Sequence, residues 1–161
     1  MPEPSFTFRS ATESDRTYLQ RLNFLADVYG DETTESHPDV VPGVAQYVDA
    51  WNPLRDGGVI AFDSFRTPAG GVWLRYWDDP AHGHANLGPE VPELAIAVEN
   101  RYAGHQLGQQ LLDRAVELAR TQGAQRVALS VAATNPRARH RYETFGFVDS
   151  PGIEGAMVFE L

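Results

Sequence analysis

Two glycines, Gly104 and Gly108, stand in the stretch RYAGHQLGQQLL (101–112), just before an amphipathic run that predicts a helix. The first turn of a helix has backbone N–H groups without intrahelical partners, and it carries the positive end of the helix dipole. Glycines in the approach let the backbone come close to an anion. The stretch therefore has the residue types of a phosphate-binding turn, although a turn with only a structural role has the same appearance.

The glycine spacing excludes two well-known nucleotide-binding motifs. The chain contains no G-x-x-x-x-G-K-[ST] sequence, which excludes a P-loop. A dinucleotide fingerprint needs G-x-G-x-x-G, normally in the first strand–helix unit, whereas these two glycines lie about two thirds along the chain.

A second group of polar residues, Asp78, Asp79, His82 and His84, falls in the sequence 78–92, which reads as a loop. These residue types bind metals, but their spacing matches no defined metal motif, so we predict no metal site. The chain has no cysteine, which excludes disulfides, thiolate metal sites and a cysteine nucleophile.

Composition narrows the function classes further. A chain of 161 residues favours one domain spanning 1–161. Thirteen basic against twenty-two acidic residues give a net charge of −9, which disfavours nucleic-acid binding and favours a cationic or amine-bearing partner, although solubility alone also accounts for it. Neither an apolar run of membrane-spanning length nor a secretion signal is present, so we expect a cytoplasmic protein that does not bind membranes.

The elements that must position these groups follow from periodicity and turn residues, and they indicate an α/β domain with one central sheet. ELAIAV (93–98) is apolar almost throughout and reads as a central strand buried on both faces. Asn135 and Pro136 predict a helix start, and Gly123 and Gly146 predict helix ends. The expected strands cover 6–9, 58–65, 71–77, 93–98, 126–132 and 156–161, with a hairpin loop at 66–71, and the expected helices cover 16–29, 44–54, 107–122 and 136–145.

The last third of the chain, 91–148, resembles the GNAT superfamily of N-acetyltransferases. In that family a strand runs into the turn V-x-P-x-Y-R-G-x-G-x-G, which leads to a long helix. A later strand is followed by N-x-x-A-x-x-x-Y-E-x-x-G-F. The second motif is matched by Asn135, Ala138, Tyr142, Glu143, Gly146 and Phe147.

The first motif is matched in part. Tyr102 and Gly104 are retained. The family's arginine falls on Ala103, and its two later glycines fall on Gln106 and on Gly108, which is again a glycine. The nearby Arg101 and His105 could supply the missing charge.

The resemblance implies a GNAT-like α/β fold with a mixed, mostly antiparallel sheet of six to seven strands, about four flanking helices and splayed central strands. It also implies acetyl-CoA as cosubstrate, with the pantetheine arm on the splayed strand edge and the diphosphate on the turn before the helix. The implied cofactor-binding residues are Ile96, Ala97, Val98, Ala103, Gly104, His105, Gln106, Leu107, Gly108, Gln109, Asn135 and Ala138. Residues 28–57 fall where the family places substrate-facing helices and loops.

For the chemistry, the resemblance implies that Tyr142 gives a proton to the leaving thiolate and that Glu93 accepts the amine proton, with His82, His84 and His105 as alternative bases. The implied acceptor is a small-molecule or peptide primary amine. A non-catalytic acyl-CoA sensor and a nucleotide-binding α/β domain remain as alternatives. The oligomeric state stays open, although similar proteins commonly form homodimers.

Overall fold

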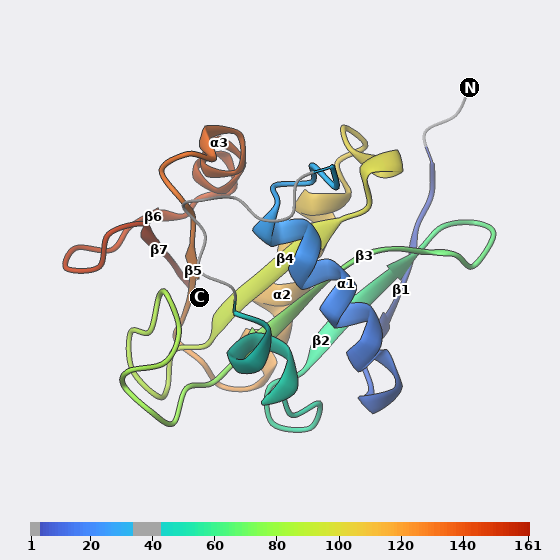
Figure 1. Ribbon diagram of the computed structural model, residues 1–161. Coiled ribbons are helices and arrows are strands. Elements are labelled where there is room, and N and C mark those ends of the chain that lie inside the picture. The colour runs from blue at the N-terminus through green and yellow to red at the C-terminus, as the bar shows by residue number, and fades with distance from the viewer. Residues whose placement is uncertain (1–3, 34–42) are drawn as a thin grey trace.

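One seven-stranded mixed sheet organises the protein (Figure 1). The computed structural model describes residues 4–33 and 43–161, so that residues 34–42 of the acidic segment lie outside the described residues. The strand order is β1-β2-β3-β4-β5-β7-β6. The bounds are β1 Thr7–Ser10, β2 Gly58–Phe62, β3 Pro68–Arg75, β4 Glu93–Val98, β5 Arg126–Ser130, β6 Val148–Asp149 and β7 Ala156–Glu160. Every neighbouring pair runs antiparallel except β4 and β5.

The parallel strands β4 and β5 meet at one end only. Their register consists of the single pair Glu93 and Ala128, whereas β4 pairs with β3 along its whole length. Beyond this pair the two strands move apart, as Figure 1 shows. The prediction of a mostly antiparallel sheet with splayed central strands is therefore confirmed.

Helices cover both faces of the sheet (Figure 1). On one face, α1 (Arg16–Asp27) and a short π-helix, η2 (Ala45–Asp49), pack through Leu19, Leu22 and Trp73. On the other, α2 (Leu107–Thr121) and α3 (Pro136–Phe145) cover a core in which Leu111 of α2 lies with Leu94 of β4 and Val127 of β5. Two short 3-10 turns, η1 (Glu13–Asp15) and η3 (Asn100–Tyr102), precede α1 and α2. The alternation of side chains along β4 supplies both cores, since Ala95 and Ala97 face α1 while Ile96 and Val98 face α2.

Local capping chemistry explains where the two site-bearing helices begin and end. The Asn135 side chain accepts a hydrogen bond from the Ala138 N–H at 3.3 Å, and Pro136 occupies the first turn of α3. Gly146, which ends α3, and Gly123, which follows α2, have φ angles of 125° and 86° that favour glycine. The helix boundaries predicted from these residues are confirmed.

The structure differs from the sequence prediction at three places. The hairpin loop is Asp63–Thr67 rather than 66–71, because the Asp63 carboxylate accepts the N–H groups of Phe65 and Thr67 and closes the turn early. The helix predicted over 44–54 is shorter, since the Asn52 side chain accepts the N–H groups of Leu54 and Arg55 in a turn. The two-residue strand β6 was not predicted.

Within the described part of the chain, no helix has both the length and the apolar character needed to cross a membrane.

Candidate active site

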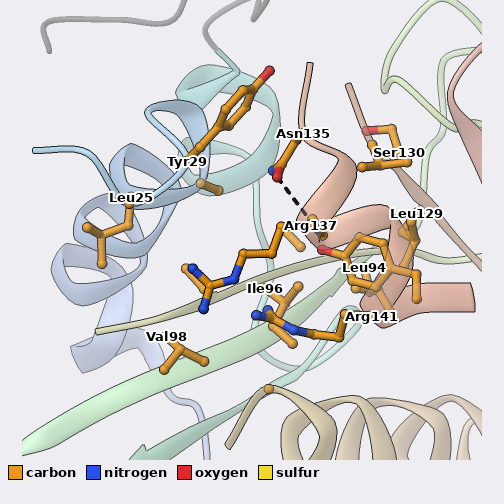
Figure 2. Close-up of a pocket in the computed structure, with 18 of the residues that line it drawn as sticks. Leu25, Tyr29, Leu94, Ile96, Val98, Leu129, Ser130, Asn135, Arg137 and Arg141 are labelled. Atoms are coloured by element: carbon orange, nitrogen blue, oxygen red, sulfur yellow. Dashed lines mark hydrogen bonds between the residues drawn. The ribbon is translucent and has the colours of Figure 1, made fainter. Parts of the chain in front are cut away.

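A cavity of about 670 Å³ opens where β4 and β5 diverge. Its walls come from the end of α1, from β4 and β5, from the turn before α2, and from α3. Figure 2 shows Leu25 and Tyr29 on one side, Ile96 and Val98 of β4 below them, and the side chains of α3 opposite. The site is therefore assembled from both halves of the chain.

The edge of β4 that faces this cavity has unpaired backbone groups. The Pro92 carbonyl accepts the Ala128 N–H at 2.9 Å, on the β5 side, and the Glu99 N–H donates to Ala69 at 2.9 Å, on the β3 side. Because backbone groups of successive strand residues point to opposite neighbours, those of Ile96 and Val98 face the gap. The gap therefore offers donors and acceptors to an extended ligand.

Ala97 differs from the expectation for this edge. Its backbone groups point the same way as those of Glu99, two residues along, which is towards β3 and away from the gap. Ala97 still lines the cavity, together with Ile96 and Val98.

The turn before α2 presents open backbone amides to the same cavity. No described residue accepts from the N–H groups of Gly104, Gln106, Leu107, Gly108 or Gln109, all of which line the cavity. Gln106 adopts a left-handed conformation with φ of 62°, at the position where the family motif has a glycine. This conformation turns the amides outward at the positive end of the α2 dipole, which suits an anion.

Two residues expected in this turn contribute differently. The Ala103 N–H donates to Asn100 and the His105 N–H to Tyr102, so these two amides close the turn. Ala103 lines the cavity, whereas His105 does not.

Two arginines that the sequence analysis did not single out, Arg137 and Arg141, supply positive charge to the cavity. Figure 2 shows both side chains extending from α3 into the space above β4. A Cβ atom added at Gly108 would lie 3.3 Å from an Arg141 guanidinium nitrogen, so Arg141 lies directly against the first turn of α2. Neither arginine forms an ion pair with a described residue. Arg101, the cation considered from sequence, instead donates to the Pro68 carbonyl and lies outside the cavity lining.

Tyr142 lies in the cavity wall beside these groups and is only 8% exposed. Its ring packs edge to face on Phe147 at 6.1 Å. Its hydroxyl forms no hydrogen bond with any residue in the described ranges. Burial raises the pKa of Tyr142, which keeps the phenol protonated at neutral pH, and the nearby Arg141 charge opposes this only in part. Asn135 and Ala138, which cap the same helix, also line the cavity, whereas Glu143 is exposed.

Glu93 is buried at the junction of β4 and β5, with 1% of its surface exposed. Its Oε1 accepts from Trp77 Nε1 and from the Ala85 N–H, both at 3.0 Å, and its Oε2 accepts from the Tyr47 hydroxyl at 2.5 Å. Burial raises the pKa of Glu93, and these three donors oppose that effect. Tyr47 and Trp77 come from segments whose contact with Glu93 had no signal in the sequence.

Asp27, at the end of α1, forms the acidic part of the cavity wall near His84. Its only described hydrogen-bond partner is the Asn23 side-chain amide at 3.3 Å. Partial burial raises the pKa of Asp27 to about 6, and the nearby His84 opposes this only in part. In the 78–92 loop, His82 lies 3.6 Å from Asp79, and no group of three or more His, Asp or Glu in the described ranges is arranged to hold a metal ion.

The seven-stranded mixed sheet with its split parallel strand pair is the fold of GNAT acetyltransferases. A family model described as the acetyltransferase (GNAT) family matches residues 22–147, and the chain belongs to this family. Proteins of this family are acyltransferases that use acetyl-CoA as cosubstrate.

Solved structures of the same fold cover nearly the whole chain. A GNAT-family acetyltransferase from Staphylococcus aureus is 14% identical, with 98% of this chain and 99% of that chain covered and a TM-score of 0.70. A protein assigned as an acetyltransferase from Salmonella typhimurium, solved with its cofactor acetyl-CoA, is 18% identical, with coverages of 97% and 94% and a TM-score of 0.68. At these identities the likeness establishes the fold.

A curated relative, mycothiol acetyltransferase of Beutenbergia cavernae, is 35% identical over 82 residues, which are 47% of this chain. The match spans only 28% of that protein's length.

Proposed function

We propose that the chain, acting as one domain, transfers the acetyl group of acetyl-CoA directly to a primary amine. One observation carries this proposal: the buried Tyr142 hydroxyl, which has no partner among the described residues, shares one cavity with the open amides of the α2 turn. The amides suit a diphosphate and the phenol suits a leaving thiolate, so the two features together favour acyl transfer over binding of a nucleotide alone.

The residues present fit acetyl-CoA. The amides of Gly104 and of 106–109 would hold the diphosphate, with Arg137 and Arg141 neutralising its charge. The backbone of Ile96 and Val98 would pair with the pantetheine arm, as an added strand would. Bound acetyl-CoA supplies the acetyl group as an activated thioester.

The protein groups then carry out two proton transfers. Tyr142 holds a proton at neutral pH and gives it to the departing sulfur. Glu93 accepts the proton of the amine, and its burial makes it a stronger base than an exposed carboxylate. A β4 amide at the gap donates to the thioester oxygen as negative charge develops there.

The acceptor end of the cavity favours a cationic amine. Asp27 carries a partly buried carboxylate that forms no ion pair with a described residue, so an incoming ammonium group would stabilise it. The partial match to mycothiol acetyltransferase is too short to select an acceptor for this chain.

The test combines binding with turnover. Acetyl-CoA should raise the melting temperature of the protein, and mixing with a panel of small cationic amines and peptides should release free thiol. Tyr142→Phe should lower kcat by about 10²-fold or more with little change in stability, because the hydroxyl bonds no residue in the described ranges.

Tyr76→Phe is the matched control, since the Tyr76 hydroxyl bonds Gln122 outside the cavity and its loss should leave kcat unchanged. Stabilisation by acetyl-CoA without thiol release from any amine would favour the acyl-CoA sensor. The absence of any stabilisation would refute the proposal.

A further inference from the structure

The Glu93 carboxylate is enclosed by protein donors, which raises the question of how an amine proton reaches it. Trp77, Ala85 and Tyr47 donate to it, and 1% of the residue is exposed. Glu93 lines the cavity but is almost fully covered, so a substrate amine has little direct access to its carboxylate.

Of the three donors to Glu93, only Tyr47 lines the cavity. A tyrosine hydroxyl has one proton to donate and two lone pairs to accept with. The Tyr47 hydroxyl donates to Glu93 at 2.5 Å and accepts the His84 backbone N–H at 3.0 Å. One lone pair is therefore left for a further donor, such as an ammonium group in the cavity.

The Tyr47 ring is held firmly in this orientation. It packs edge to face on Trp77 at 5.1 Å and stacks on His84 at 5.7 Å, and the residue is 6% exposed. Its backbone carbonyl also accepts from Trp73 Nε1 at 2.8 Å. The hydroxyl is therefore preorganised between the cavity and the carboxylate.

We propose that Tyr47 relays the acceptor's proton to Glu93, a step that rests on the proposed acetyl transfer. The N–H bond of the ammonium group breaks as that proton bonds to the Tyr47 oxygen. At the same time the original Tyr47 O–H bond breaks and its proton bonds to Glu93 Oε2. The amine is left neutral, Tyr47 is unchanged and Glu93 is protonated.

The electrostatic surroundings favour a concerted relay. Burial and the Glu93 charge raise the pKa of Tyr47, so a free tyrosinate is unfavourable and the two protons move together. Among the described residues, the other charged or titratable groups around the pair are His84 and His82 of the loop, Asp27 of α1 and Arg75 of β3. The Arg75 guanidinium carbon lies 4.6 Å from the centre of the Trp77 ring, which His82 also contacts.

Two variants distinguish a proton relay through Tyr47 from a purely supporting role, because each variant removes one hydrogen bond from the Glu93 carboxylate. Tyr47→Phe should lower kcat/KM for a small primary amine by about 10²-fold or more. Trp77→Phe, which removes a donor outside the cavity lining, should lower it less than about tenfold. Adding Tyr47→Phe to Glu93→Gln should cost nothing further, because both residues serve one step.

The pH dependence gives a readout that a supporting role would not change. In the unmodified protein, kcat/KM should level off once Glu93 has lost its proton. In Tyr47→Phe it should keep rising about tenfold per pH unit towards the amine's own pKa, since only amine already neutral in solution reacts. If Tyr47→Phe does not fold, fluorotyrosine at position 47, an isosteric and more acidic phenol, should change the rate and its pH profile.

Equal losses in Tyr47→Phe and Trp77→Phe, with unchanged pH profiles, would overturn the relay and leave the transferase intact. An unchanged rate with fluorotyrosine would do the same. If the unmodified protein releases no thiol with any amine, the proposed function fails and the relay fails with it.

Discussion

Arg141 offers the sharpest test of how this site holds an anion. Its guanidinium lies against Gly108 in the first turn of α2, where the open amides are. We predict that Arg141→Gln weakens acetyl-CoA binding while leaving the fold unchanged, because the side chain is exposed and makes no ion pair in the described structure.

The expected loss follows from the charge and its exposure. Two unit charges about 4 Å apart interact by about 4 kcal/mol at the effective dielectric of a protein surface. Water and salt reduce this, and a hydrogen bond to a charged group contributes about 1.5–3 kcal/mol net. Because Arg141 is exposed, we take the lower half of that range, which corresponds to a 10- to 40-fold rise in Kd.

Isothermal titration calorimetry with acetyl-CoA measures this change directly. Arg139→Gln is the matched control, since Arg139 lies on the same helix but pairs with Asp149 and does not line the cavity. The Arg141→Gln loss should be larger at low salt than at high salt, because exposed charge pairs are screened. If both variants bind acetyl-CoA equally well, or if the loss is independent of salt, the placement of the diphosphate at this helix terminus is wrong.

Three further predictions concern stability and are measured by urea denaturation. Gln106→Gly removes the cost of a left-handed glutamine and should stabilise the protein by about 0.5 kcal/mol, after the extra flexibility of unfolded glycine is counted; reduced acetyl-CoA affinity in this variant would instead assign binding to the glutamine side chain. The pKa of Asp27 is raised to about 6 in the folded state. The stability that protonated Asp27 contributes is therefore fully present below about pH 4 and is lost as the pH rises through 6. Asp27→Asn should therefore be more stable by about 1 kcal/mol at pH 7, allowing for the partial exposure of Asp27, and should show no advantage at pH 4. Arg75→Met leaves Asp56, which is fully buried and 2.6 Å from Arg75, without this partner and should cost about 3 kcal/mol; a neutral result would mean that Arg55 alone compensates Asp56.

Much of the anion-binding end could be predicted from sequence because it depends on local geometry. Asn135 caps α3 through a hydrogen bond to a residue three positions along, and Gly104 and Gln106 lie in the turn that opens α2. The apolar run 93–98 also predicted a central strand, which the structure confirms. Contacts of this kind involve neighbouring residues, so their spacing appears directly in the sequence.

The two cavity arginines illustrate what spacing alone leaves open. Arg137 and Arg141 are four residues apart, so a helix places them on one face, and this was a usable signal. Arg139 lies on the same helix and has the same charge, but its guanidinium donates to the Asp149 carboxylate instead. Only the packing of α3 beside α2 decides which face meets the open amides.

The sequence by itself determined the central strand and the capped helices, because backbone conformation and capping depend on residues a few positions apart. The role of Tyr142 as a proton donor was implied only by the family resemblance. The tertiary structure alone decided that Glu93 is enclosed and that Tyr47, forty-six residues away in sequence, donates to it. It also decided that the backbone groups of Ala97 point to β3 rather than to the gap. These features depend on how distant segments pack and on which strand edges stay unpaired, and packing of that kind leaves no periodic pattern in the chain.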